Sequence, residues 1–564
     1  MKTRWMWALA LPGVMGVSAS LHACGDAGSA GGLPSEPSYD AAVGFDAASP
    51  RADSGGTVPP PEVEVRRSFQ TPQAGGRFVY VANPTRDTVA VIDSSTLAIQ
   101  TVETGDGPTY LSTIPGQDVA LVINVNSHSV TVLRTTERGT VTSNVPIVTG
   151  ANAIAIAPDG RHALAYFDST LPGATASNGS FQDLSVITLE AGNDRAVQLS
   201  VGFRPVDVLF SSDGSRAFVV TEDGISILRF ADITGPTIVP NVSLEDSSIA
   251  PVSDGGVDAS TADVAVDATL DAPDASLRVP ARDVSITPDG RYAVARVEGT
   301  GNLRLVDLAT RAITAINVGG AVTDLDVSPS GTYALAVVRE RSQVLRIPLP
   351  MGFSDPSTIT TTEATGEFVG SVTIAPDGGR ALLYTTALPI ERVTLMDLSS
   401  APSLQVIRMR KAVRAVAFAP DGRSALVVHT SIGGDPAQAG IDLETQIDRS
   451  FGYTLVDTAT RFAKLQLTPA DVGPFAIVPD GSHCFVLLRD DAHAIAQAQR
   501  VSLRSFVIDT VTLGSPPLSV GAVPGTARAF IGQDHPEGRI TFVDWNTGAL
   551  QSVTGFELNS RVVD

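Results

Sequence analysis

The stretch "ITPDGRYAVAR", residues 286–296, decides the fold because variants of it recur along the chain. Six further copies align with it on a shared glycine: "IAPDGRHALAY" (156–166), "FSSDGSRAFVV" (210–220), "VSPSGTYALAV" (327–337), "IAPDGGRALLY" (374–384), "FAPDGRSALVV" (418–428) and "IVPDGSHCFVL" (477–487). Three consecutive intervals between these glycines are 41, 47 and 44 residues. Propeller blades of four strands repeat every ~40 to 50 residues, so the period predicts blades.

Each copy has the pattern of a β-hairpin. Pro or Ser begins a turn, Asp caps it with its side chain, and Gly adopts the positive φ of a tight turn. The recurring aspartates are therefore assigned to turns, because a catalytic carboxylate would break a repeat and not follow it. They include Asp159, Asp289, Asp377, Asp421 and Asp480.

A third strand follows each hairpin, and it often ends in aspartate. Examples are "AVID" at Asp93, "RLVD" at Asp307, "TLMD" at Asp397, "TLVD" at Asp457 and "TFVD" at Asp544. Turn residues such as "LAT" and a fourth strand such as "AITAINVGG" come next. The sequence thus predicts an all-β fold built from four-stranded antiparallel blades.

The segment "RFVYVANPTRDTVAVIDSSTLAIQTVETGDGP", residues 77–108, resembles the YVTN family of bacterial β-propeller repeats. Tyr80, Val81 and Asn83 match the Tyr-Val-Thr-Asn motif, with Ala82 in place of Thr, and weaker copies cover most of residues 69–564. The resemblance implies a propeller. It does not imply an activity, because the family includes surface-layer proteins, lipoproteins and proteins without a known function.

The repeats give about ten units, more than the four to eight blades that are typical. Divergent units at about 109–148 and 516–556 and an incomplete one at 77–104 join the seven quoted copies. We expect a single ring, in which the C-terminal segment "ELNSRVVD", 557–564, supplies the first strand of the N-terminal blade. Two smaller rings, or one ring of eight blades, are the alternatives.

The N-terminus has the pattern of an export signal. Lys2 and Arg4 precede an apolar run that is too short to span a bilayer, and the run ends at Leu21, Ala23 and Cys24, which resemble a bacterial lipobox. Residues 1–23 are thus predicted to be a lipoprotein signal peptide and Cys24 the lipidation site, although an ordinary cleaved signal is the alternative. Residues 24–68, rich in Gly, Ala, Ser, Asp and Pro, are predicted to form a flexible tether.

The charge of the chain limits its partners. The formal net charge is −21, which disfavours nucleic acids and anionic lipid headgroups. We therefore expect contact with the membrane through the lipid anchor only. Cys484 has no partner for an intramolecular disulfide once Cys24 is acylated. It replaces the alanine of other copies, so we expect a small buried residue and not a reactive thiol.

Two insertions interrupt the period, at residues 246–280 and 431–451. The first is predicted to be disordered, and the second to be an ordered loop on one face. The first contains six aspartates, but their spacing differs from the alternating ligands of a calcium loop, so a solvated acidic loop is favoured over a calcium site. These residues are Asp254, Asp258, Asp263, Asp267, Asp271 and Asp274.

Several polar residues break the repeat and are the remaining candidates for a site: His128, His429, Asp435, Asp442, Glu444, His493 and His535. No pair has the spacing of metal ligands, and no haem, P-loop, dinucleotide or nucleophile-elbow motif is present. The sequence therefore assigns no catalytic, cofactor-binding or metal-binding residue and no cofactor.

The sequence favours a non-enzymatic binding or scaffold protein, lipid-anchored in the cell envelope at an outer membrane or periplasmic face, with an envelope protein or surface polymer as its partner. A lactonase-like hydrolase with a site at the central channel is the main alternative, and a purely structural wall component is another. The two leading hypotheses differ in where the pattern-breaking residues lie. A hydrolase needs them gathered at the channel, and a binding scaffold allows them to spread over loops.

Overall fold

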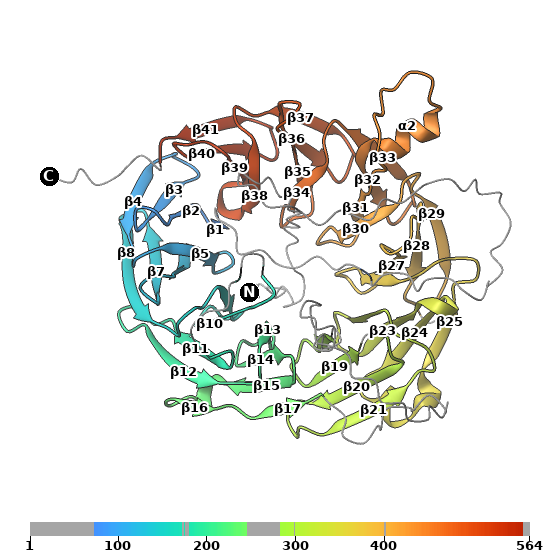
Figure 1. Cartoon of the computed structure of the whole chain (residues 1–564), viewed down its shortest axis with the longest axis horizontal. Helices are drawn as coiled ribbons and strands as arrows, with labels where there is room; N and C mark the ends of the chain where they lie inside the picture. Colours follow the sequence, from blue (N-terminus) through green and yellow to red (C-terminus); the bar gives the residue numbers. More distant parts are fainter. Residues whose placement is uncertain are drawn as a thin grey trace, which may run out of the picture.

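The computed structural model describes Glu62, residues 73–171, residue 174, and residues 180–244, 282–297, 299–399 and 402–556. Ten four-stranded antiparallel sheets, one of them extended by a fifth strand, are arranged as one β-propeller ring (Figure 1). The first strand of each sheet faces the centre of the ring and the fourth lies at its rim. The prediction of ten blades in a single ring is confirmed.

The strands of blades 1 to 5, from first to fourth, are as follows. Blade 1 has β1 (Gln73–Ala74), β2 (Phe78–Asn83), β3 (Thr88–Asp93) and β4 (Ile99–Glu103), and blade 2 has β5 (Pro108–Thr113), β6 (Val119–Asn124), β7 (Ser129–Thr136) and β8 (Gly139–Pro146). Blade 3 has β9 (Ala153–Ile156), β10 (His162–Tyr166), β11 (Asp183–Thr188) and β12 (Arg195–Ser200), and blade 4 has β13 (Pro205–Phe210), β14 (Arg216–Thr221), β15 (Gly224–Arg229) and β17 (Asn241–Ser243). Blade 5 has β18 (Arg282–Ile286), β19 (Tyr292–Val297), β20 (Asn302–Asp307) and β21 (Ile313–Asn317).

The other five blades follow the same order. Blade 6 has β22 (Asp324–Val327), β23 (Tyr333–Val338), β24 (Gln343–Pro348) and β25 (Thr360–Glu363), and blade 7 has β26 (Ser371–Ile374), β27 (Arg380–Tyr384), β28 (Arg392–Asp397) and β29 (Leu404–Arg408). Blade 8 has β30 (Val413–Phe418), β31 (Ser424–His429), β32 (Phe451–Asp457) and β33 (Ala463–Thr468), and blade 9 has β34 (Val472–Ile477), β35 (His483–Asp490), β36 (Ile495–Ser502) and β37 (Ile508–Thr512). Blade 10 has β38 (Pro517–Val523), β39 (Arg528–Gln533), β40 (Arg539–Asp544) and β41 (Leu550–Thr554).

Helices are short and lie in the connections between strands. They are η1 (Phe230–Asp232), η3 (Arg339–Arg341), α1 (Met351–Ser354), η4 (Pro356–Thr358), α2 (Leu443–Arg449) and η5 (Pro524–Thr526). After η1 the chain forms β16 (Thr237–Ile238), which pairs in parallel with β12 of the preceding blade. The fifth strand of blade 3 therefore comes from blade 4 and ties the two blades together.

The turn after each first strand has the predicted chemistry. Eight of its glycines have φ between +63° and +71°, a region that residues with a Cβ rarely adopt. They are Gly116, Gly160, Gly214, Gly290, Gly331, Gly378, Gly422 and Gly481. The five aspartates assigned to these turns each accept a backbone N–H from two residues ahead, over 2.9–3.0 Å. The assignment of these carboxylates to turns is confirmed.

The aspartates that end the third strands also cap turns. In blades 1, 5, 7, 8 and 10, this carboxylate accepts a backbone N–H from two residues ahead over 2.8–3.0 Å. At Asp307, the N–H groups of Thr310 and then Ala309 hold the pKa of the carboxyl below its usual range. Both kinds of recurrent aspartate therefore position the strands.

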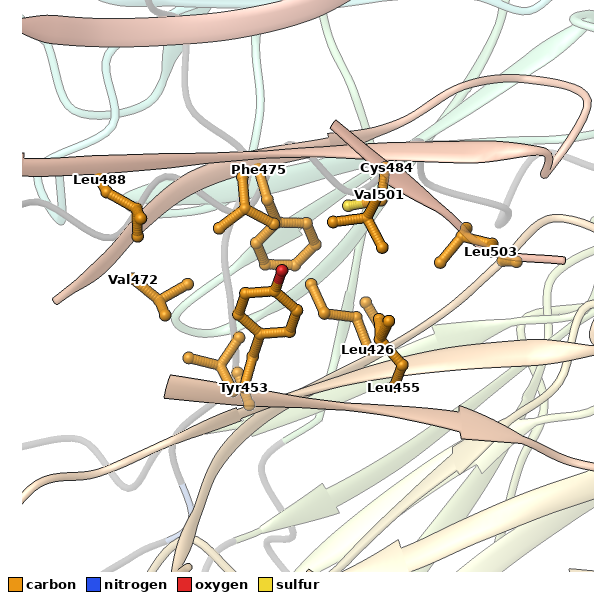
Figure 2. Packing of buried hydrophobic residues seen from close by; sticks show 14 of the residues in the cluster. Leu426, Tyr453, Leu455, Val472, Phe475, Cys484, Leu488, Val501 and Leu503 are labelled. Carbon is orange, nitrogen blue, oxygen red and sulfur yellow. The ribbon is translucent and has the colours of Figure 1, made fainter. Parts of the chain in front are cut away.

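The hydrophobic core is divided among the junctions between blades. The buried apolar residues form ten clusters, and each cluster draws its residues from two neighbouring blades. Figure 2 shows the junction of blades 8 and 9, where Tyr453 and Leu426 meet Phe475 and Cys484. Cys484 is fully buried there, as predicted. Each blade therefore packs against and stabilises both of its neighbours.

The ring closes differently from our expectation. The inner position of blade 1 is held by β1, and not by the C-terminal segment 557–564, which lies outside the described residues. The chain reverses from β1 into β2 at Gly75 and Gly76, with Gly75 donating to the carbonyl of Phe78 over 2.8 Å, and a Cβ on Gly75 would meet the carbonyl oxygen of Gln117 at 2.6 Å. Blades 1 and 10 then join by side-chain packing and by a 2.8 Å hydrogen bond from Gly525 to the Gly76 carbonyl.

The two faces of the ring are built from different connections. Strands run antiparallel in sequence order within a blade, so successive connections alternate between the two faces. The turn face carries the connections from first to second and from third to fourth strand, including the glycine turns. The loop face carries the connections from second to third strand and from blade to blade, such as 339–342, 385–391 and 430–450.

Candidate functional site

A recess on the loop face, between blades 6 and 7, holds the carboxylate of Glu62. Glu62 belongs to the segment that we predict to be the tether, and its side chain is 2% exposed. The recess is formed by Arg339, which begins η3 after β23, and by Thr385, Thr386 and Ala387, which follow β27. Two connections of the loop face thus converge on one side chain that is remote in sequence.

Five hydrogen bonds reach the two oxygens of this carboxylate. Oε1 accepts from the guanidinium of Arg339 and the hydroxyl of Thr385, both over 2.9 Å. Oε2 accepts from the backbone N–H and hydroxyl of Thr386, over 2.6 and 2.9 Å, and from the N–H of Ala387 over 3.3 Å. Every one of these contacts is a donor, so the recess selects a group that accepts hydrogen bonds and carries negative charge.

The floor of the recess requires a glycine. A Cβ on Gly370, which directly precedes β26, would overlap Oε1 of Glu62. The carbonyl of Gly370 is itself fixed by the hydroxyl of Thr323 over 2.6 Å. Gly370 does not have a positive φ, so the close approach of the carboxylate explains this glycine and backbone strain does not.

The insertion at 431–451 contains α2 and lies on the loop face, in the blade that follows the connection 385–391 of the recess. Asp442 caps α2 by accepting the N–H of Thr445 over 2.8 Å. Lys411, only 1% exposed, donates its ammonium to the carbonyl oxygens of Ile447 and Asp448 at the end of α2, over 2.7 and 2.9 Å. Burial lowers the pKa of Lys411 and raises that of Asp448. The ammonium thus supports the helix C-terminus.

His429 is a core residue beneath this insertion. Its side chain lies between the carbonyl of Ala412, 3.1 Å from Nδ1, and the hydroxyl of Thr454, 2.7 Å from Nε2. Burial lowers the pKa of His429 from 6.5 to about 4. Both ring nitrogens have protein partners, so we assign His429 to the support of the insertion.

The structure spreads the pattern-breaking residues around the ring but places all of them on or beside the loop face. His128, His493 and His535 lie in the connections from second to third strand of blades 2, 9 and 10. His429 ends the second strand of blade 8, and the remaining three, Asp435, Asp442 and Glu444, lie in the insertion that follows it. Within the described ranges, no three His, Cys, Asp or Glu residues are grouped so as to hold a metal ion.

The turn face has a polar hollow of about 620 Å³ between blades 7 and 8. Its lining includes Arg380, Arg423 and four aspartates that serve the turns: Asp377, Asp397, Asp421 and Asp457. Arg380 donates to the hydroxyl of Thr458 over 2.8 Å. The turns of two adjacent blades account for the four aspartates around this hollow.

Sequence reasoning missed the recess, and no signal in the sequence marks it. Glu62 lies at the end of the low-complexity segment, after three prolines, and nothing there specifies a partner. Arg339 and Thr385 lie in connections that differ from blade to blade. Two other predictions, Cys24 as a lipidation site and 246–280 as an acidic loop, lie outside the described residues.

Comparisons with known proteins add little to this geometry. No family model matches the chain, and no curated protein matches it. Among solved structures, similarity is found to "Dihydro-heme d1 dehydrogenase NirN in complex with DHE" (10% identity, TM-score 0.40, covering 78% of this chain and 73% of that one). Similarity is also found to Kuenenia stuttgartiensis hydrazine synthase (15% identity, TM-score 0.29, covering 60% of this chain and 100% of that one). A eukaryotic initiation factor is similar as well (10% identity, TM-score 0.43, covering 78% of this chain and 97% of that one). The fold assignment therefore depends on the ten sheets of this chain itself.

Among the described residues, no helix is long and apolar enough to cross a membrane.

Proposed function

We propose that the chain is a YVTN-type repeat protein that is exported, anchored to the cell envelope through a lipid on Cys24, and acts there as a non-enzymatic binding scaffold. The ring provides the scaffold, and the loop face provides the binding surface for an envelope protein or surface polymer. The sequence of residues 1–24 supports export and lipidation, and the composition of residues 25–61 supports a tether that separates ring from membrane.

The uneven division of features between the two faces carries this proposal. The turn face repeats the same glycine and aspartate turns around the ring, whereas the loop face varies from blade to blade. The loop face bears the residues that break the repeat, the Glu62 recess and the insertion with α2. Variable connections on a repeated scaffold are the usual place for binding residues.

The insertion also exposes apolar side chains, which favours a protein partner. Ile432 is 56% exposed and Leu443, the first residue of α2, is 67% exposed. Apolar side chains that lie together at a surface, among polar residues that can orient a partner, are typical of contact sites.

Two experiments test the proposal. First, mass spectrometry of the N-terminal peptide and membrane fractionation compare the native protein with Cys24→Ser. We expect an acylated Cys24 and a membrane fraction that the variant loses, and an unmodified, soluble native protein would contradict lipid anchoring.

Second, crosslinking in intact cells compares the native protein with the double variant Ile432→Asp and Leu443→Asp. Leu550→Asp is the matched control, because Leu550 is also exposed but lies in β41 at the rim. We expect a specific crosslinked partner to be lost with the loop-face variant and kept with the rim control. Equal crosslinking of all three proteins would contradict a binding role for the insertion.

A further inference from the structure

We propose that the recess formed by Arg339, Thr385, Thr386 and Gly370 is a recognition site for an acidic side chain on an extended peptide of a partner protein, and that Glu62 occupies it in cis until that partner displaces it. This rests on the proposed function, since it names the ligand chemistry of the loop face.

The donors of the recess all belong to the ring. All of its donors come from blades 6 and 7, and two of them are consecutive backbone N–H groups, of Thr386 and Ala387, which cannot turn away. Thr385 is 1% exposed and the side chain of Arg339 is 14% exposed. Buried donors that lose their acceptor are costly, so a site of this kind favours continuous occupation by a carboxylate.

The contacts that the structure describes for the occupant are made by its side chain. The described contacts of Glu62 are those of its carboxylate with Arg339 and with residues 385–387. A peptide from another protein that presents the same carboxylate can make the same five hydrogen bonds. The cis occupant then acts as a competitor, so the apparent affinity for the partner is the affinity of the empty recess multiplied by the fraction of time that the recess is open.

The donor set discriminates between a carboxylate and its amide. A glutamine in the same place would direct its NH₂ group at donors, either the N–H groups of Thr386 and Ala387 or the guanidinium of Arg339. We expect an amide to bind at least about tenfold more weakly than a carboxylate, which corresponds to about 1.4 kcal/mol.

The test uses the full chain and a fluorescent peptide that copies residues 57–66, "TVPPPEVEVR", with binding measured by fluorescence anisotropy. The protein is compared as wild type and as Glu62→Ala, which empties the recess. We expect Glu62→Ala to bind the peptide at least about tenfold more tightly than the wild type does. The peptide with Glu62→Gln should bind at least about tenfold more weakly to the emptied recess.

Matched variants locate the binding. Gly370→Ala in the Glu62→Ala chain should abolish binding, because its Cβ would overlap the site of the carboxylate oxygen. Gly433→Ala, whose Cβ would meet nothing, should leave binding unchanged. Arg339→Gln should weaken binding strongly, and circular dichroism of each variant confirms that the ring is folded.

Three results would overturn the inference: no binding to the emptied recess, equal binding to wild type and Glu62→Ala, or equal binding of the Glu and Gln peptides. A uronate oligosaccharide that displaces the peptide at lower concentration than the unlabelled peptide does would reassign the recess to a polymer and refute the peptide ligand. The anisotropy assay uses purified protein in solution, so a negative result there would refute the peptide site without contradicting lipid anchoring or the crosslinked partner. A negative result in the fractionation or crosslinking experiments would likewise not contradict peptide binding by the recess.

Discussion

Replacing His429 with glutamine should reduce the loss of stability that the ring suffers in mild acid. The imidazole is 1% exposed, and both of its nitrogens are hydrogen-bonded, Nδ1 with the carbonyl of Ala412 and Nε2 with the hydroxyl of Thr454. Burial lowers the pKa of His429 from 6.5 to about 4 in the folded protein. The unfolded chain therefore binds this proton first as the pH falls.

The sign of the effect follows from that order. Above pH 6.5, the pKa of the unfolded state, His429 is neutral in both states and does not reduce the free energy of unfolding. As the pH falls from 6.5 toward 4, only the unfolded state binds the proton, so the free energy of unfolding decreases. At 1.36 kcal/mol for each pKa unit, protonation in the unfolded state costs about 2.5 kcal/mol between about pH 7.5 and 4.5. The turn aspartates, whose pKa values are lowered, lose their contribution at lower pH, below the ordinary range of a carboxyl.

Urea titrations followed by circular dichroism at several pH values measure this effect. We expect the wild type to lose about 2.5 kcal/mol more than His429→Gln between about pH 7.5 and 4.5. His128→Asn is the matched control, because it removes an exposed imidazole and keeps a residue that tolerates the left-handed backbone at φ +49°. Parallel pH profiles of wild type and His429→Gln would refute the buried, neutral state of His429.

Three further predictions concern the blades themselves. Gly290→Ala should lower the free energy of unfolding by about 1–2 kcal/mol, because Gly290 has a φ of +63°. The control is Gly235→Ala, where a Cβ would meet nothing. In the same urea titration it should change the free energy of unfolding by less than about 0.5 kcal/mol. Tyr453→Phe should cost about 1–2 kcal/mol, because it leaves Oε1 of Gln499, 2.8 Å from the phenol oxygen, without this donor between blades 8 and 9. Cys484 should resist a maleimide until urea unfolds the ring, because burial raises the pKa of its thiol; labelling of the native protein within minutes would contradict this.

The blades were predictable because each repeats one local rule. The copy at 286–296 requires a positive φ at Gly290 and a capping carboxylate at Asp289, and both requirements are read from neighbouring residues. The position of Cys484 was predictable for the same reason, since it takes the place of a recurrent alanine.

The recess and the identity of the inner strand of blade 1 were not predictable in this way. The contact of Glu62 with Thr386 spans 324 residues and repeats nowhere in the pattern. Blade 1 takes β1 as its inner strand, although a strand from the C-terminus satisfied the same local pattern. Where a local rule allows two partners, tertiary packing decides between them.

Closure of the ten blades into one ring is the claim on which the recess and both faces depend, and an engineered disulfide tests it most directly. The hydroxyls of Ser94 in blade 1 and Thr526 in blade 10 lie 2.7 Å apart although 432 residues separate them. In a Cys24→Ser chain that carries Ser94→Cys and Thr526→Cys, oxidation should link these two positions within one monomer, as shown by mass spectrometry of the joined peptides. Links only between separate chains, or two free thiols after oxidation, would contradict a ring closed between the first and last blades.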